Sequence, residues 1–276
     1  MNNKQCCTES SDKVLDQNYW DGQYKANTTG WDLGVISPPL KAYIDAIEDK
    51  NRAILIPGCG NTYEAAYLLE MGFTNITVID IAPTLIRILQ QKFATNNNIQ
   101  IVLGDFFKHQ GSYDLIIEQT FFCALPPTMR QEYVAKMHDL LAKNGKLAGV
   151  LFNRTFTAGP PFGGSQEEYK LLFKDAFEVL TMDVSKNSIT PRANTELFIE
   201  LKKMDATNVN LYKLEGIITN DSTSAVVSKL EKLESVLNVS INTDYTILLL
   251  VSTNEFPLSD LQEVLSYDNN LKINKI

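Results

Sequence analysis

The chain has 276 residues and a formal net charge of −8 at pH 7, and 44% of its residues are hydrophobic. This length accommodates a large α/β domain and a smaller second domain with a substantial core. The negative charge argues against a nucleic-acid substrate, because phosphate contacts require clustered Lys and Arg.

Neither a metal site nor a membrane segment is expected. The four cysteines, at positions 6, 7, 59 and 123, have the spacing of neither a zinc site nor a disulfide framework, which fits a reducing compartment. Residues 1–12 lack the apolar segment of a signal peptide, and the longest apolar run, 247–251, is too short to cross a bilayer. We therefore expect a cytoplasmic protein without membrane contact, and a disordered polar segment over 1–13.

Both tryptophans precede the first predicted strand. Trp20, Tyr24 and Trp31 lie in a segment that also contains Gly and Thr, and a helix is predicted over 41–50. These aromatics could form a lid, because an indole face is the best neutral partner for a cation such as a sulfonium. A hydrophobic strap over the helices is the alternative, and the sequence leaves both interpretations open.

The most informative stretch begins with a short apolar run over 54–57. Gly58 and Gly60 follow it, and apolar residues then recur at helical spacing. This pattern predicts a strand, a tight loop and a helix, the opening of a doubly wound α/β domain. Asn61, with Glu64 three residues later, has the form of a helix N-cap and its returning carboxylate, so the helix is expected to start there.

The ligand of this loop is indicated by the sequence around it. A dinucleotide fingerprint requires a third glycine where Tyr63 stands, and no lysine follows the loop as in a P-loop. A second apolar run ends in Asp80, which could accept both hydroxyls of a ribose, and a third precedes Asp105 and Phe106, which offer contacts for an adenine. These features, in this order, look like the S-adenosylmethionine site of a class I methyltransferase. Each taken alone also has a purely structural explanation, as a loop, a helix cap or a core residue.

Two later segments are expected to face the reactive end of this cofactor. The strand predicted over 113–117 leads into Glu118 and Gln119, and ligands bind outside the carboxyl ends of strands. Further on, glycines and prolines surround Phe162 in the loop 153–164, which could close over the acceptor. A plain connecting loop is the alternative there.

The remaining elements complete the first domain. A helix over 129–141, closed by 143–145, and a strand over 146–152 precede the loop. A helix over 167–177 and strands over 177–184 and 196–201 follow it. Candidates for attracting an anionic acceptor are Arg154 and Arg192, whereas both histidines, His109 and His138, are expected to face solvent.

With these residues in place, positions 1–204 resemble the thiopurine S-methyltransferase superfamily, and more closely its plant and bacterial thiol and halide methyltransferases, the harmless-to-ozone-layer proteins. The motifs that carry the resemblance are the Trp20, Tyr24, Trp31 spacing, the segments 31–34, 56–61, 105–107 and 113–124, and 159–162. It implies a Rossmann-like sheet whose early aromatics, glycine loop, second-strand acid and Asp-Phe pair line the S-adenosylmethionine site.

The resemblance implies transfer of a methyl group to a small soft nucleophile, with no residue required as acid or base. Tyr24 stands where the plant halide enzymes usually carry tryptophan, and Gln119 where they usually carry tyrosine. A thiol or hydrosulfide is therefore the favoured acceptor. Halide, thiocyanate, an aromatic thiol such as a thiopurine, and a non-catalytic S-adenosylmethionine sensor remain alternatives.

Residues 211–276 are predicted to form a separate unit with strand–helix–strand–strand–helix–strand order, which is ferredoxin-like. It resembles the heavy-metal-associated domain of copper chaperones, with 216–219 where the binding loop of such a domain begins. The segment 220–224 contains no cysteine, so delivery of a soft metal is not expected. Self-association or binding of a protein partner is the role we expect for this unit, if it has one beyond structure.

Overall fold

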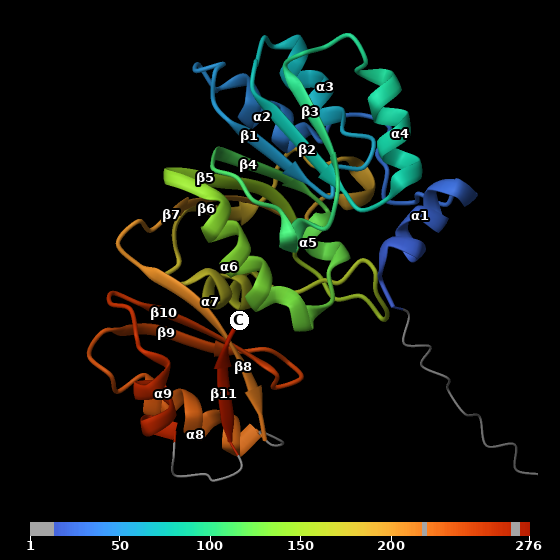
Figure 1. The fold of residues 1–276 in the computed structure, drawn as a ribbon. Helices are drawn as coiled ribbons and strands as arrows, with labels where there is room; N and C mark the ends of the chain where they lie inside the picture. The colour runs from blue at the N-terminus through green and yellow to red at the C-terminus, as the bar shows by residue number, and fades with distance from the viewer. Residues whose placement is uncertain (1–13, 217–219, 266–270) are drawn as a thin grey trace, which may run out of the picture.

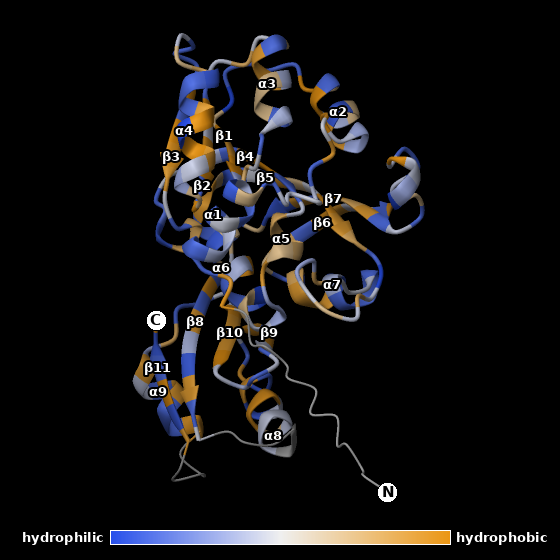
Figure 2. Cartoon of the chain, turned by 90° about the vertical axis from the view of Figure 1, so that its right-hand side faces the viewer, coloured by the Kyte–Doolittle hydropathy of each residue, from blue (hydrophilic) through white to orange (hydrophobic). Residues whose placement is uncertain are grey.

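The computed structural model describes residues 14–216, 220–265 and 271–276. Residues 1–13, for which disorder is expected, and residues 217–219 of the predicted loop 216–219 lie outside the described residues. Within them the chain forms a seven-stranded and a four-stranded sheet, with α6 (Arg130–Leu140) and α7 (Gln166–Phe173) between the two (Figure 1). Hydrophobic residues concentrate along the strands of both sheets (Figure 2).

The large sheet has the order β3-β2-β1-β4-β5-β7-β6. Its first five strands in this order are parallel, whereas β7 is antiparallel to both β5 and β6. The order reverses between β1 and β4, which places a ligand crevice at their carboxyl ends. The strands are β1 (Ile54–Pro57), β2 (Ile76–Asp80), β3 (Ile99–Leu103), β4 (Tyr113–Gln119), β5 (Leu141–Phe152), β6 (Phe177–Val184) and β7 (Glu196–Lys203).

Helices cover both faces of this sheet because alternate strand residues point to opposite sides. Ile54 and Ile56 pack in one core cluster with three helices, whereas Leu55 belongs to the other cluster, with α6 and α7. The three helices are α2 (Pro38–Asp45), α3 (Tyr63–Glu70) and α4 (Pro83–Lys92). The remaining elements of this domain are α1 (Gln17–Ala26), α5 (Phe121–Ala124), and the 3-10 turns η1 (Phe106–Lys108), η2 (Pro127–Met129) and η3 (Thr190–Arg192).

Several element boundaries differ from the sequence prediction. The helix expected over 41–50 is α2 (Pro38–Asp45), the helix expected over 167–177 ends at Phe173, and the strand expected over 113–117 extends to Gln119.

The N-cap position of α3 is Thr62, in the left-handed region and without a side-chain capping bond, rather than Asn61, whose side chain instead donates to Asp32. The predicted break over 143–145 does not separate α6 from β5, because β5 begins at Leu141. The register with β4 shifts there, and Asn144, at φ 60°, donates its N–H to Asp205.

The small sheet has the antiparallel order β11-β8-β10-β9. Its elements follow the strand–helix–strand–strand–helix–strand order expected from the sequence. They are β8 (Asn208–Glu215), α8 (Asn220–Leu230), β9 (Val236–Ile241), β10 (Ile247–Ser252), α9 (Leu258–Leu265) and β11 (Lys272–Lys275).

Both faces of the small sheet are covered. Leu248 and Leu250 share a cluster with residues of α8 and α9. The alternate residues Leu249 and Val251 belong instead to the core cluster that contains α6 and α7. The C-terminal unit is therefore packed against the large domain through one face of its sheet.

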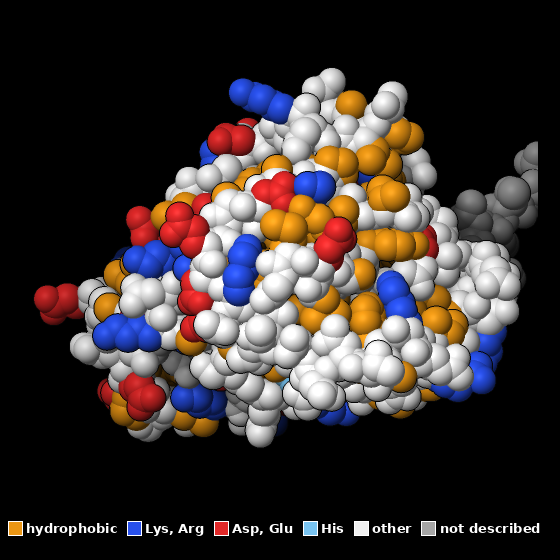
Figure 3. All heavy atoms as spheres, turned by 90° about the horizontal axis from the view of Figure 1, so that it is seen from above, with side chains coloured by type: hydrophobic (Ala, Val, Ile, Leu, Met, Phe, Trp, Pro, Cys, Tyr) orange, Lys and Arg blue, Asp and Glu red, His pale blue; other side chains and the backbone are white. Residues whose placement is uncertain are grey.

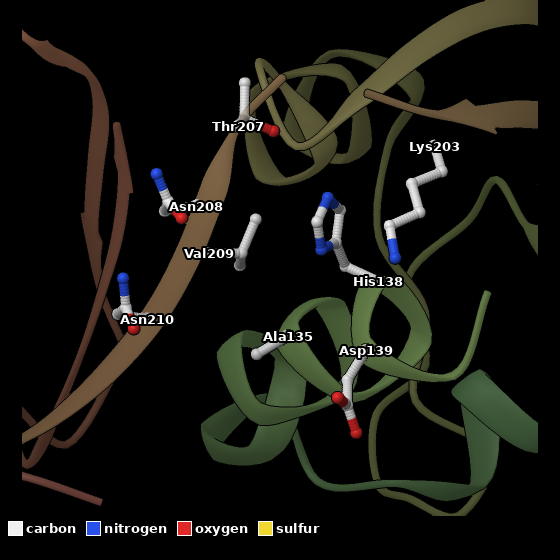
Figure 4. A pocket seen from close by; sticks show the side chains of 8 residues that line it. All are labelled: Ala135, His138, Asp139, Lys203, Thr207, Asn208, Val209 and Asn210. Atoms are coloured by element: carbon white, nitrogen blue, oxygen red, sulfur yellow. The ribbon is translucent and has the colours of Figure 1, made fainter. Parts of the chain in front are cut away.

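A polar cavity of about 230 Å³ lies where α6 meets the start of β8 (Figure 4). His138 faces it and is only 8% exposed, so the expectation that this histidine faces solvent is wrong. Burial, followed by the charge of Lys203, lowers the pKa of His138 to about 4. The other lining residues are Ala135, Asp139, Thr207, Asn208, Val209 and Asn210.

Candidate active site

The glycine loop connects β1 to α3. Gly58 and Gly60 both adopt the left-handed region, at φ 52° and 51°, which lets the chain turn sharply. Asp80, at the end of the neighbouring strand β2, accepts hydrogen bonds from the N–H of Gly60 at 3.3 Å and of Ala82 at 2.9 Å. Burial raises the pKa of this carboxyl. The loop and Asp80 thus form one unit at the carboxyl ends of β1 and β2.

The early aromatics lie beside this loop. The Trp31 ring makes edge contacts with Trp20 and Tyr24, at centroid distances of 5.5 and 5.9 Å. The Tyr24 hydroxyl is the nearest group to the position that a Cβ on Gly60 would occupy, at 3.7 Å. Burial, and next the charge of Asp80, raises the pKa of Tyr24 well above its usual value. The aromatic cluster therefore borders the glycine loop.

Carboxylates hold the aromatic segment in place. Asp21 on α1 accepts from the N–H of Thr84, at the start of α4, at 2.7 Å. Asp32 accepts from the Asn61 side chain, and from the Tyr63 hydroxyl at 3.3 Å. The sequence analysis did not predict that Asp21 and Asp32 hold this segment. For Asp21 the local signal was Lys25, four residues later, and the two side chains form an ion pair.

Glu64 also holds the chain that precedes β1. It is buried, and its carboxylate accepts from the N–H of Ser37 at 3.4 Å rather than returning to a helix N-cap. Burial raises its pKa. Asn61 and Glu64 therefore both connect the glycine loop and α3 to the chain that precedes β1.

Asp105 and Phe106 follow the end of β3. The Asp105 carboxylate accepts from the N–H of Phe107 at 2.9 Å and so caps the 3-10 turn η1. Phe106 is buried, with its ring edge-on to those of Phe107 and Phe121. The pair thus joins η1 to the segment after β4.

Two neighbouring side chains at the carboxyl end of β4 have unused hydrogen-bonding capacity. Glu118 is fully buried, and one of its oxygens accepts from the N–H groups of Phe121 and Phe122 at 2.9 and 3.0 Å. Its other oxygen, and both amide atoms of Gln119, are buried without a partner among the described residues. Burial raises the pKa of Glu118 to about 8. Such unpartnered polar atoms are costly in a folded chain and are a common feature of ligand sites.

The loop 153–164 packs on the segment after β4. The N–H of Phe162 donates to the carbonyl of Cys123 at 2.6 Å. Arg130 holds the loop from the other side: it donates to the carbonyl of Gly163 at 2.7 Å and is ion-paired with Glu168. Its guanidinium lies over the rings of Phe122 and Tyr169, at 5.1 and 5.6 Å. This buried arginine is a residue that the sequence reasoning did not single out.

The two arginines predicted to attract an acceptor have other partners. Arg192 is ion-paired with buried Glu196 at 3.2 Å and donates to the carbonyl of Trp31 at 3.0 Å. It therefore ties the aromatic segment to η3. Arg154 is exposed, with its guanidinium 4.8 Å from the Phe156 ring centroid.

Neither histidine lies at the carboxyl end of β4. His109 is bonded to the Tyr113 hydroxyl, at the opposite end of that strand, at 2.7 Å. His138 lies at the junction with the C-terminal unit. Within the described chain, no group of three His, Cys, Asp or Glu side chains is arranged to hold a metal ion.

A family model described as thiopurine S-methyltransferase matches residues 15–207. The chain belongs to the thiopurine S-methyltransferase family. A probable thiol methyltransferase 2 of Arabidopsis thaliana is 29% identical over 191 residues, covering 67% of this chain and 84% of the relative. Thiocyanate methyltransferase 1 of the same plant is 22% identical over 200 residues, covering 70% and 88%. Thiopurine S-methyltransferase of Vibrio vulnificus is 30% identical over 178 residues, covering 58% and 82%.

Solved structures share the fold of this family member. The 1,6-didemethyltoxoflavin-N1-methyltransferase of Burkholderia thailandensis, solved with S-adenosylhomocysteine, aligns with a TM-score of 0.56 and 19% identity over 68% of this chain and 87% of its own. A Methanosarcina mazei methyltransferase aligns with a TM-score of 0.51 and 18% identity, over 58% and 96%. The large domain therefore has the class I methyltransferase fold. The protein is an S-adenosylmethionine-dependent S-methyltransferase.

Proposed function

We propose that the acceptor is a thiol or hydrosulfide that reaches the active site already able to react. The observation that carries this proposal is the pair of side chains at the carboxyl end of β4: the uncharged amide of Gln119, whose atoms have no partner among the described residues, and the fully buried carboxyl of Glu118, one of whose oxygens already accepts from two backbone N–H groups. Burial raises the pKa of Glu118 to about 8 and that of Cys123 to about 12, and Gln119 carries no charge. With no histidine nearby, a nucleophile that needs a strong base would not be activated, whereas thiols are partly ionised at neutral pH.

The cofactor half of the site fits S-adenosylmethionine, which supplies a methyl group on a positively charged sulfur. We assign the ribose hydroxyls to Asp80, because its carboxylate retains lone pairs beyond the two that Gly60 and Ala82 use. The backbone of Gly58, Gly60 and Asn61 would contact the amino-acid moiety. The sulfonium side is assigned to Trp20, Tyr24 and Trp31, the adenine side to Asp105 and Phe106, and support of the loop to Glu64.

The chain's own contribution to the reaction is alignment and exclusion of water. Gln119 would orient the acceptor, since its buried amide can donate to a thiolate and accept from a thiol. Phe162 and its loop would close the acceptor side, held by Arg130 and by the carbonyl of Cys123. Arg192 would act through the aromatic segment rather than on the acceptor. Arg154 would contribute little, because its charge is exposed.

A volatile-product assay tests the acceptor. Purified protein and S-adenosylmethionine are incubated in sealed vials with hydrosulfide, a small alkyl thiol, iodide or thiocyanate, and a thiopurine is assayed in parallel by chromatography. Methanethiol or a methyl thioether formed at rates far above methyl iodide is the expected result. Turnover of iodide, thiocyanate or the thiopurine alone would contradict the proposal. Cofactor binding without turnover of any acceptor would favour a sensor.

For the whole chain, we infer a methyltransferase domain over 1–204 and a ferredoxin-like unit over 211–276. The strand order β11-β8-β10-β9 supports the second assignment.

We also infer a cytoplasmic enzyme that binds neither nucleic acid nor membrane. Lys and Arg are scattered among acidic and hydrophobic side chains on the face in Figure 3. None of the described helices is long and apolar enough to cross a bilayer.

A further inference from the structure

The acceptor-side segment, residues 121–130 between β4 and α6, depends on long-range contacts for its position. Between α5 and α6 the chain has only the three-residue turn η2, and it contains Pro126 and Pro127, which have no N–H to donate. Its own backbone bonds are local, from Leu125 to Phe122, Met129 to Pro126 and Arg130 to Pro127. They shape the turn, whereas its position relative to the rest of the site depends on contacts from outside.

One of these contacts comes from the C-terminal unit. Asn242, at the end of β9, donates from its side-chain amide to the carbonyl of Thr128 in η2, at 2.9 Å. Asn242 is 3% exposed. Its oxygen accepts from the N–H groups of Thr246 and Ile247, both at 2.9 Å. These two donors determine which end of the amide is oxygen, so its NH2 group must face Thr128.

The same region is packed as well as hydrogen-bonded. Leu249 and Val251 of β10 share a core cluster with Phe122 on α5, inside the segment, and with Tyr133 on α6. The C-terminal sheet thus touches the helix that ends the segment, while Asn242 touches the segment itself. The face of the sheet that could otherwise bind a partner is occupied within the chain.

We propose that the C-terminal unit fixes the acceptor-side segment of the active site through Asn242, which makes Asn242 a positioning residue for the acceptor. This inference rests on the proposed assignment of that segment to the acceptor. A displacement of η2 would reach Gln119 and Phe162 through the short α5 segment, because Phe162 is bonded to Cys123. Small misplacements of this kind reduce turnover without affecting cofactor binding.

Asn238 provides a control at a more exposed position. It lies on β9, four residues before Asn242, and donates a bond of the same type, from its amide to the carbonyl of Lys174, at 3.0 Å. Lys174 caps the end of α7, outside the acceptor-side segment. Asn242→Asp and Asn238→Asp each remove the NH2 donor, and the first keeps an oxygen for Thr246 and Ile247. Because Asp244 and Glu132 are close together there, the uncharged Asn242→Ser is made as well.

The test compares amide hydrogen exchange and steady-state kinetics of these variants in the full-length enzyme. Both Asn242 variants are expected to exchange faster over 121–130 and to lose about three- to tenfold in kcat/KM for the acceptor, with KM for S-adenosylmethionine within about twofold. Asn238→Asp should change neither measurement. Asn242 variants that match Asn238→Asp in both would overturn the proposal.

The outcomes separate this inference from the function on which it rests. A wild-type enzyme that turns over no thiol or hydrosulfide would defeat the acceptor assignment, while the exchange comparison would still report whether Asn242 holds the segment. If Asn242→Asp does not fold, Asn242→Ser decides the result. Variants with lowered thermal stability but unchanged exchange over 121–130 and unchanged acceptor kinetics would show a structural role only, and would also overturn the proposal.

Discussion

The cofactor half and the acceptor half of this active site are built differently. Around the cofactor, the glycine loop is held by Asp80, one strand away, through backbone N–H groups. Around the acceptor, side chains bond across long stretches of the chain: Arg130 holds Gly163 of the loop 153–164, and Asn242 holds Thr128 of the segment after β4. The first half uses the strand ends that every doubly wound domain supplies. The second depends on contacts particular to this chain, which is where acceptor choice can vary.

Asp80→Asn should produce the largest kinetic change. It removes the negative charge assigned to the ribose and places an NH2 group against the N–H of Gly60. We expect KM for S-adenosylmethionine to rise on the order of 100-fold, with KM for the acceptor nearly unchanged. Asp105→Asn is the control, since Asp105 caps η1, and it should cost less than about fivefold. Equal effects of the two substitutions would contradict the separate roles assigned to these acids.

Arg130→Met should affect the acceptor half instead. It removes the bond to Gly163 and the ion pair with Glu168 while keeping an apolar side chain between Phe122 and Tyr169. We expect a loss of about ten- to hundredfold in kcat/KM for the acceptor, with KM for S-adenosylmethionine within about threefold. Glu168→Gln, which leaves the bond to Gly163, should lose much less. A parallel rise in the KM for the cofactor would show that the two halves are not independent.

His138 should affect stability and neither half of the site. Its pKa is lowered to about 4, so between its ordinary value of 6.5 and pH 4 the unfolded chain binds a proton that the folded chain does not. The free energy of unfolding is therefore highest above about pH 6.5. It falls as the pH is lowered from 6.5 to 4, by about 1 to 2 kcal/mol after allowance for solvent screening at the cavity. His138→Gln should flatten this dependence in urea unfolding between pH 4 and 7. An unchanged slope would mean that other groups cause it.

Arg192→Gln should have a small kinetic effect, confined to the cofactor half. Arg192 holds the carbonyl of Trp31, and its loss leaves Glu196 buried without its ion pair. We expect KM for S-adenosylmethionine to rise about three- to fivefold, with the acceptor KM unchanged. Arg154→Gln is the matched control and should leave both constants unchanged. An acceptor effect from either variant would restore the arginines as anion-attracting groups.

The same division explains what could be predicted from the sequence. The strand, glycine loop and helix, and the position of Asp80 at the end of the next strand, depend on neighbouring residues and on a local pattern, so they were predictable. The helix cap was predicted at Asn61 and lies at Thr62, because Asn61 bonds to Asp32, 29 positions earlier. The bond from Asn242 to Thr128 joins residues 114 positions apart, and no local pattern encodes it.

Burial is a second reason for the limits of the sequence prediction. Glu118, Gln119 and Cys123 could be placed after a strand, but the shift of the Glu118 pKa to about 8 follows from complete burial in the folded chain. Likewise, the arginines at 154 and 192 looked equivalent as possible anion attractors. The folded structure shows that Arg192 instead pairs with Glu196 and holds the carbonyl of Trp31.

A pH–rate profile shows whether the acceptor side supplies a base. kcat/KM is measured against pH for hydrosulfide and for alkyl thiols of different pKa, with the wild type and Glu118→Gln. Without a protein base, the midpoint of each profile should follow the pKa of the acceptor and be the same in both proteins. One midpoint near 8 for every acceptor, abolished in Glu118→Gln, would instead identify Glu118 as the base.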